Sequence, residues 1–306
     1  MIIITASAHP IIIETLTEKG LDFIYLPEIN RDELLEIIPK ATGIIVATKI
    51  NIDNKIIDNA PHLKWIGRLG SGMEHIDVSY AQSKNIQCIS SPEGNRNAVA
   101  EHALGLLLGL MRNAFKSSNE VKNNFWLREV NRGDELCGKT IGIIGFGNTG
   151  SAFAKLLSSF DVNILAYDKY KKGFGNDNIM ESSLETVMKK SDVVSFHLPL
   201  TKETKHFADK QFFNGLTHQP YLINTSRGSV INTAALIFAL EQKIIKGAAL
   251  DVLENEDLSS FSLTEKRAFE YLTHHEKVII TPHIAGYSFE ANYNMSVTLL
   301  KKLGIY

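Results

Sequence analysis

A glycine-rich turn in the middle of the chain constrains the fold more than any other feature. Residues 141–150 read IGIIGFGNTG, an apolar run that leads into a G-x-G-x-x-G turn, and the helical pattern SAFAKLLSSF follows. This spacing between a strand and a helix is typical of a dinucleotide-binding unit. Such a unit usually opens with the turn, but about 140 residues precede it here. Either an extra domain comes first, or another domain is divided around this one.

Each position of the turn has a physical role in that interpretation. Gly145 permits the tight turn, Gly147 lets the backbone approach a pyrophosphate, and Gly150 lets the helix pack close to the strand. The N–H groups of Asn148 and Thr149 at the helix N-terminus would face the phosphates.

The next apolar run, VNILAYD, ends at Asp168, near the usual spacing for a ribose-binding acid. Its carboxylate would accept hydrogen bonds from the ribose hydroxyls and repel a 2′-phosphate, which favours NAD over NADP. The alternative is a purely structural turn, with Asp168 capping a strand end. The combination of strand, turn, helix and acid favours the NAD site.

Short apolar runs alternate with helical patterns on both sides of the turn. Expected strands are 2–5, 23–26, 44–47, 65–69 and 87–90, then 141–145, 162–167, 192–196, 221–225, 247–252 and 277–281. Expected helices in the first half are 10–19, 31–38, 53–59 and 78–84, with Gly20 ending the first and Asn30 and Asp53 capping the next two. This alternation predicts an α/β protein with two doubly wound parallel sheets.

A long helix is expected at 97–123, because AVAEHALGLLLGLMRNAF is apolar nearly all round. Such a helix must be buried, in a domain core or at a subunit interface. Together with NNFWLREV at 123–130, it predicts a homodimer. The most apolar part, 103–111, is too short to span a bilayer, and we expect no membrane partner.

Composition narrows the class of protein. The net charge of −2 offers no basic field for nucleic acid. Two widely separated cysteines, Cys88 and Cys137, argue against a disulfide framework or a thiolate metal site, and we expect no metal. The opening MIIITASAHP has no basic region and resembles a first strand, so the sequence indicates a cytoplasmic protein.

Polar residues follow three of the later apolar runs. Arg227 comes after YLINTS, Asp251 and Glu256 lie in ALDVLENE, and His283 comes after VIITP. Ligands of open α/β sheets bind outside the carboxyl ends of the strands, so these side chains could converge on one crevice. Taken alone, Arg227 would most simply be a surface residue in an ion pair, and His283 would most simply be a turn residue.

Jointly, these residues supply what hydride chemistry on a hydroxy acid needs. A cation holds the carboxylate and polarises the carbonyl oxygen, while a histidine moves the hydroxyl proton. An acid beside that histidine holds its tautomer and raises its pKa.

Several ordered motifs resemble those of the D-isomer-specific 2-hydroxyacid dehydrogenases, over essentially the whole chain. They are GFGNTG, HLPLT at 197–201, INTSRG, ALDVLENE and TPHIAG, together with RLGSGMEHID at 68–77 and EGNRNAVAEHALGLLL at 93–108. The resemblance implies a flavodoxin-like substrate domain, 1–92 with 285–306, and a Rossmann NAD-binding domain at 93–284 inserted into it. The insertion would explain why the glycine-rich turn lies mid-chain.

The resemblance also implies roles for residues. The catalytic set would be Arg227, Glu256 and His283, with His283 as acid/base. The cofactor set would include, besides the glycine-rich turn and Asp168, the residues His197, Thr225, Ser226, Asp251 and Gly286. The substrate set would include Lys49, Ser71, Gly72, Asn95 and Arg227, with the 71–72 amides on the substrate carboxylate.

The substrate stays open at this point. Lys49 matches a basic position that D-3-phosphoglycerate dehydrogenases use, and Arg68 lies near the carboxylate loop, so D-3-phosphoglycerate and a place in serine biosynthesis are favoured. A solvated loop lysine is the plain alternative. Glyoxylate or hydroxypyruvate reduction is the second possibility. A function without catalysis also stays open, because NAD-sensing corepressor proteins share this fold and similar site residues.

Overall fold

The computed structural model describes residues 1–306 and divides them into two compact units. Unit 1 comprises Met1–Ala98 and Tyr287–Tyr306, and unit 2 comprises Val99–Gly286. Unit 1 is therefore discontinuous in sequence, which explains why the glycine-rich turn lies in mid-chain. The boundaries expected from the sequence lie a few residues earlier, and the assignment of one unit to substrate and the other to cofactor stays a prediction.

Unit 1 is built on a five-stranded parallel sheet in the order β2-β1-β3-β4-β5. Its strands are β1 (Ile2–Ile4), β2 (Phe23–Tyr25), β3 (Gly43–Val46), β4 (Trp65–Arg68) and β5 (Gln87–Ser90). The helices between them are α1 (Pro10–Glu18), α2 (Arg31–Ile37), α3 (Asn54–Asp58) and α4 (Val78–Ser83). The order is that of flavodoxin-like domains, as predicted.

The helix ends expected from the sequence are confirmed. Asn30 caps α2, since its side chain accepts from the N–H groups of Asp32 and Glu33. Asp53 caps α3 in the same way, through the N–H of Ile56. Gly20 follows α1 with a φ of +62°, a conformation that glycine adopts without strain.

The last helix, α12 (Phe289–Lys302), belongs to unit 1 although it follows unit 2 in the chain. Its residues Leu299 and Leu300 are fully buried in a cluster with Ile4, Leu16 and other residues of the first sheet. A Cβ at Gly94 would collide with the backbone of α12, so close approach requires glycine there. Apolar burial thus returns the C-terminus to the first sheet.

Unit 2 holds a seven-stranded parallel sheet in the order β12-β11-β10-β9-β6-β7-β8. Its strands are β6 (Thr140–Ile144), β7 (Asn163–Tyr167), β8 (Ile179–Glu181), β9 (Val193–Phe196), β10 (Tyr221–Asn224), β11 (Gly247–Leu250) and β12 (Val278–Ile280). The helices between them are α7 (Asn148–Leu157), α8 (Leu184–Lys190), α9 (Lys210–Asn214), α10 (Thr233–Glu241) and α11 (Leu263–His274). The direction of winding reverses between β6 and β9, where an open α/β sheet binds its ligand.

Six of these seven strands were predicted from the sequence. The missing one, β8, is a three-residue edge strand, and its residues are only partly buried or exposed. A strand that short carries no clear alternation of apolar and polar residues.

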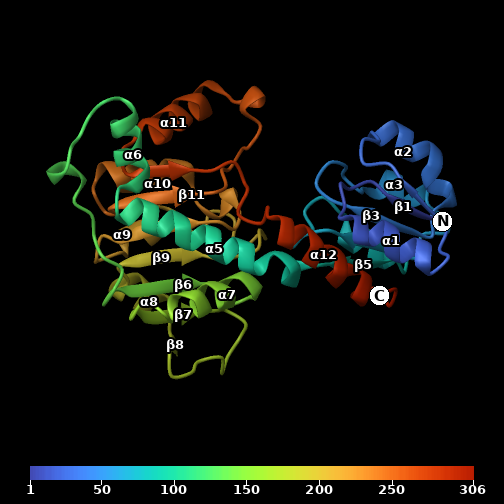
Figure 1. Ribbon diagram of the computed structural model, residues 1–306, viewed down its shortest axis with the longest axis horizontal. Helices are drawn as coiled ribbons and strands as arrows, with labels where there is room; N and C mark the ends of the chain where they lie inside the picture. Colours follow the sequence, from blue (N-terminus) through green and yellow to red (C-terminus); the bar gives the residue numbers. More distant parts are fainter. The chain divides into compact units, whose positions relative to one another are not determined.

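The prediction of one helix over 97–123 is wrong. The structure has α5 (Pro92–Met111) and a separate helix α6 (Ala114–Lys122). Asn113 lies between them in the left-handed conformation, with a φ of +52°, and so ends the first helix. The apolar face of α5 packs into the core of unit 2, with Ala103, Leu107 and Leu110 against Ile143 and Phe153; Figure 1 shows α5 crossing the face of the large sheet.

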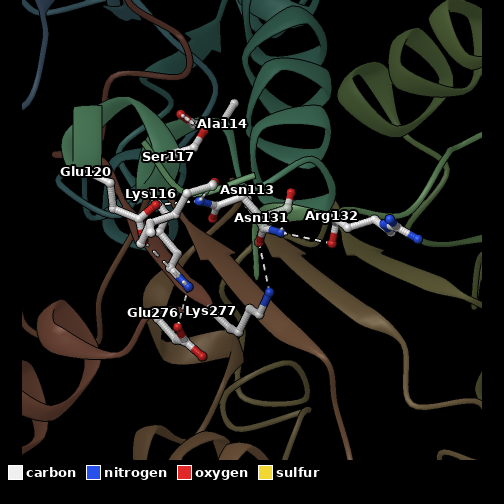
Figure 2. A network of polar contacts seen from close by, with 10 residues as sticks. Asn113, Ala114, Lys116, Ser117, Glu120, Asn131, Arg132, Glu276 and Lys277 are labelled. Carbon is white, nitrogen blue, oxygen red and sulfur yellow. Dashed lines mark hydrogen bonds and ion pairs between the residues drawn. The ribbon is translucent and has the colours of Figure 1, made fainter. Parts of the chain in front are cut away.

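A polar network fixes the break between the two helices (Figure 2). The amide of Asn113 donates to the carbonyl oxygens of Asn131 and Arg132, at 3.4 Å each, and its Oδ1 accepts from Lys277 at 2.8 Å. Lys116 on α6 pairs with Glu276 at 2.6 Å. Segments far apart in the sequence are thus joined where the sequence alone suggested a continuous helix.

No helix of the structure combines the length and the apolar character that a membrane crossing requires.

Candidate active site

The glycine-rich turn connects β6 to α7 as predicted. Gly145 has a φ of +95°, and a Cβ there would collide with the carbonyl of His197 at the end of β9. A Cβ on Gly150 would collide with the carbonyl of Gly145, so the helix approaches the turn closely. A Cβ on Gly147 would meet only open space. No neighbour within the chain therefore requires glycine at 147, which leaves that side of the backbone accessible to a phosphate.

Asn148 and Thr149 form the first turn of α7, where the N–H groups have no partner within a helix. These donors and the positive end of the helix dipole suit a phosphate group. The turn and the helix N-terminus therefore fit a dinucleotide.

Asp168 directly follows β7 and lies against the glycine-rich turn. Its carboxylate accepts from the N–H groups of Phe146 at 2.8 Å and of Tyr170 and Lys171 at 2.9 Å. Burial alone would raise the pKa of Asp168, but these N–H groups and the Lys171 charge hold it below its ordinary value. The residue is therefore an anion at neutral pH, held rigidly beside the turn.

His197 is buried beneath the same turn. Its Nε2 lies 2.9 Å from the hydroxyl of Ser195, and its ring packs against Phe153. Burial lowers the pKa of His197 to about 3, so the imidazole is neutral. The side chain therefore supports the turn from inside.

Arg227, Glu256 and His283 follow three neighbouring strands, β10, β11 and β12. Because the strands are parallel, their carboxyl ends lie along one edge of the sheet. The structure thus brings together the three residues that the sequence grouped. Arg227 is half-buried, and its Nη1 donates to the carbonyl of Ser226 at 2.7 Å.

The imidazole of His283 and the carboxylate of Glu256 form a direct pair, with 2.8 Å between Nδ1 and Oε2. The hydrogen bond to Glu256 raises the pKa of His283 above its ordinary value of 6.5, against the opposing effects of burial and of Arg227. Since the carboxylate can only accept, Nδ1 carries the proton and Nε2 is the free nitrogen. Nearly half of each side chain is exposed, so Nε2 is accessible to a substrate.

Asp251 lies at the end of β11 and is almost fully buried, with 1% of its surface exposed. Its carboxylate accepts from the Thr281 hydroxyl at 2.6 Å and from the N–H groups of Ile284 at 2.9 Å and Ala285 at 2.8 Å. Its carbonyl accepts from the N–H of His283 at 2.7 Å. Burial would raise the pKa of Asp251, but the hydrogen bonds from His102 and these groups lower it.

The turn that carries His283 depends on this carboxylate. His283 has a φ of +55°, a left-handed conformation that costs a residue with a side chain about 1–2 kcal/mol. The hydrogen bonds to Asp251 on both sides of His283 offset that cost. Gly286 directly follows this turn as the last residue of unit 2.

Thr225 and Ser226 are buried between β10 and Arg227. The side chain of Asn224 shapes this segment, since it accepts from the N–H of Ser226 at 3.0 Å and donates to the carbonyl of Arg227 at 3.0 Å. Asn224, His102 and Thr281 also contact these residues, although the sequence did not single them out. A buried polar side chain at the end of an apolar run is the signal that could have revealed Asn224.

In unit 1, Lys49 lies in the loop after β3, at the carboxyl edge of the first sheet. Its ammonium donates to Glu28 Oε2 at 3.1 Å and to the carbonyl of Pro27 at 3.0 Å. Both charged side chains are exposed, Glu28 at 94% and Lys49 at 44%. The positive charge expected for a substrate phosphate is therefore already paired with a carboxylate.

Ser71, Gly72 and Asn95 lie together in unit 1. The Ser71 hydroxyl donates to Asn95 Oδ1 at 3.0 Å, and the N–H of Gly70 donates to the hydroxyl of Ser91 at 3.1 Å. The loop after β4 is thus tied to the beginning of α5. The N–H groups of Ser71 and Gly72 donate to no acceptor in the chain, so they are available to a ligand.

The family model of the D-isomer specific 2-hydroxyacid dehydrogenase, NAD binding domain, matches residues 104–285. The chain belongs to this family. Its unit 2 is the NAD-binding domain, and the two parallel sheets are those expected for a dehydrogenase of this kind. The chain is therefore an NAD-dependent enzyme of the D-2-hydroxyacid dehydrogenase family.

Three comparisons illustrate the range of relatives. A glyoxylate reductase of Thermofilum pendens is 37% identical over 90% of this chain and 80% of its own. A D-3-phosphoglycerate dehydrogenase of Archaeoglobus fulgidus is 32% identical over 95% of this chain but 54% of its own. A D-lactate dehydrogenase from Aquifex aeolicus, solved with NAD and lactic acid, has a TM-score of 0.85 and 27% identity, covering 99% of this chain and 94% of its own.

The Glu256→Gln substitution should lower the pKa of His283 towards its ordinary value. The glutamine keeps a hydrogen-bond acceptor near Nδ1 but removes the negative charge that favours imidazolium. NMR titration of the His283 ring protons measures this shift directly. Glu254→Gln is the matched control, because Glu254 pairs with His206 instead. An unchanged titration in Glu256→Gln would contradict the pairing.

Proposed function

We propose that the chain transfers hydride between NAD and the C2 atom of a short D-2-hydroxy acid or 2-oxo acid, with His283 as the acid/base. The pair of His283 and Glu256 beside Arg227, at three neighbouring strand ends, is the observation that carries the proposal. It combines an imidazole whose pKa is raised, a carboxylate that orients it and a guanidinium for an anionic substrate.

Different residues of unit 2 would contact different parts of the cofactor. We propose that the turn from Gly145 to Gly150, with the N–H groups of Asn148 and Thr149, holds the pyrophosphate, and that Asp168 accepts from the ribose hydroxyls. The backbone at His197, the segment of Thr225 and Ser226, and Gly286 would border the cofactor. Bound NADH supplies the hydride, and NAD accepts it.

In the reducing direction, His283 would hold a proton on Nε2 and donate it to the carbonyl oxygen of the substrate. Glu256 keeps the imidazole oriented through Nδ1 and stabilises the imidazolium. Arg227 would bind the substrate carboxylate and polarise the carbonyl bond. In the oxidising direction, neutral His283 would accept the hydroxyl proton. The sequence suggested that Asp251 contacts the nicotinamide end, but its side chain is completely buried. We therefore propose that it acts there only by holding the 281–285 turn through the N–H groups of Ile284 and Ala285.

For unit 1, we propose that the N–H groups of Ser71 and Gly72 bind a substrate carboxylate, with Asn95 holding the loop in place. The hydrogen bond between Ser71 and Asn95 supports this role.

Among substrates, we favour an unphosphorylated 2-oxo acid such as glyoxylate or hydroxypyruvate. Lys49, which carried the preference for D-3-phosphoglycerate, is paired with Glu28, and a dianionic phosphate would have to displace that carboxylate. The similarity to a glyoxylate reductase also extends over a larger share of the relative. D-3-phosphoglycerate remains the second candidate, because Lys49 and Arg68 are both cations of unit 1. Rates of NADH oxidation with glyoxylate, hydroxypyruvate and phosphohydroxypyruvate discriminate between an unphosphorylated and a phosphorylated substrate.

His283→Ala should reduce turnover by about 10²–10⁴-fold, the range for loss of a positioned general acid/base. The KM for NADH should change little, because the glycine-rich turn and Asp168 hold the other end of the cofactor. Steady-state kinetics with the favoured 2-oxo acid measures both parameters. His274→Ala, an exposed histidine on α11, is the control. Wild-type turnover in His283→Ala would refute the assignment.

NADH should be preferred to NADPH by at least about 100-fold in kcat/KM, because juxtaposed like charges cost several kcal/mol. The rigid anion of Asp168 would face the 2′-phosphate of NADPH. Asp168→Ala should reduce the ratio of kcat/KM for NADH to kcat/KM for NADPH. Equal kcat/KM for both cofactors in the wild type would mean that Lys169 or Lys171 compensates, and would defeat this role for Asp168.

We also propose a homodimer, through the 123–130 segment that the sequence indicated together with α6, and not through α5. The apolar side chains of α5 are mostly buried within unit 2. A group of exposed apolar residues lies instead on α6 and the segment after it: Phe115, Val121, Phe125, Trp126, Leu127 and Val130. Trp126 is 78% exposed, and the network of Asn113 and Lys116 holds this segment in place (Figure 2). Such a patch is typical of a protein–protein interface.

Light scattering at micromolar concentration should give the mass of a dimer. The double substitution Phe125→Asp and Trp126→Asp should shift the protein to a monomer, because the interface would bury two uncompensated charges. Leu263→Asp is the matched control, since Leu263 is 75% exposed on α11. A monomeric wild type, or a double variant that stays dimeric, would exclude this surface.

A further inference from the structure

His102 lies on α5 and reaches the network beneath the catalytic turn. Its Nε2 is 3.0 Å from the hydroxyl oxygen of Thr281 and 3.4 Å from Asp251 Oδ1. The side chain of His102 is 23% exposed, while that of Asp251 is completely buried. An imidazole from a helix thus meets the two residues that precede and support the segment carrying His283.

The hydrogen positions in this network follow from the groups present. The carboxylate of Asp251 can only accept, so the single hydroxyl hydrogen of Thr281 points to Oδ1, at 2.6 Å. The Thr281 oxygen must then accept from His102. His102 therefore carries a proton on Nε2 and donates it to the Thr281 oxygen, with Asp251 Oδ1 at 3.4 Å.

The network leads directly to the catalytic histidine. Asp251 Oδ1 accepts from the Thr281 hydroxyl and from the N–H of Ile284, and Oδ2 accepts from the N–H of Ala285. His102 Nε2 lies 3.4 Å from Oδ1. The N–H of His283 donates to the backbone carbonyls of Asp251 and Thr281, at 2.7 and 3.0 Å. Because His283 lies in a left-handed conformation, its direction depends on these contacts on both sides.

We propose that His102 is a positioning residue for catalysis: its Nε2–H group holds Thr281 and Asp251 in the arrangement that fixes the 281–285 turn and aims His283. This inference rests on the proposed function of His283. The ordinary alternative is a histidine that only fills space beside the sheet. The two differ because a space-filling residue can be replaced by an apolar side chain of similar size without affecting the turn.

Three substitutions of His102 separate these possibilities. His102→Leu removes the donor and keeps most of the volume. His102→Gln places an amide N–H₂ near the position of Nε2, and His102→Asn keeps a polar amide that is too short to reach it. His218→Leu is the control for loss of a histidine, because His218 is exposed in unit 2 and far along the chain from this network.

We expect His102→Leu and His102→Asn to lower kcat by about 10- to 100-fold, the scale of a small misplacement of a catalytic group. The KM for NADH should stay unchanged, and His102→Gln should recover most of the lost turnover. Hydrogen–deuterium exchange, a readout independent of activity, should become faster for the Ile284 and Ala285 amides in the Leu and Asn variants but not in the Gln variant.

Wild-type turnover and exchange in His102→Leu would overturn the proposal, and so would a Gln variant as impaired as the Leu variant. If His102→Leu does not fold, the comparison of the Asn and Gln variants decides in the same way. Failure of the proposed function is distinguishable, because it would appear as normal turnover in His283→Ala while the exchange result for the 281–285 turn stands.

Discussion

The buried carboxylate of Asp251 holds together the edge of the unit 2 sheet that carries His283. A charge in this position is costly to remove from water unless donors surround it. Three side chain and backbone groups within 2.9 Å, together with His102 at 3.4 Å, meet this requirement. All of them except His102 come from the segment that follows β12. Solvation of one anion thus decides the path of the chain around His283.

The parallel sheet of unit 2 brings the residues of the proposed site close to one another. Arg227, Glu256 and His283 are separated by many residues, yet they follow strands that are neighbours in register. Loops at the carboxyl ends of parallel strands share one edge of the sheet, so the proposed catalytic set needs no additional device to bring it together. The proposed acid/base chemistry then depends on the hydrogen bond between Glu256 and His283, which raises the pKa of the imidazole.

Contacts within the chain also change the interpretation of Lys49 and of helix α5. Lys49 as a free cation suggested a phosphate, but the structure pairs it with Glu28, twenty-one residues earlier. The long apolar helix suggested a surface for a second subunit, but α5 uses most of that face for the core of unit 2. In both cases the contacts that the structure shows come from parts of the chain that no local pattern connects to the residue.

The sequence by itself determined the alternation of strands and helices, the glycine-rich turn and the strand ends that carry Asp168, Arg227 and His283. These features depend on local apolar periodicity and on backbone requirements of single residues. Only the tertiary structure decided the break at Asn113, the edge strand β8, the Lys49 pair and the network of His102 and Asp251. Each of these depends on contacts between segments distant in sequence, whose partners no local pattern identifies.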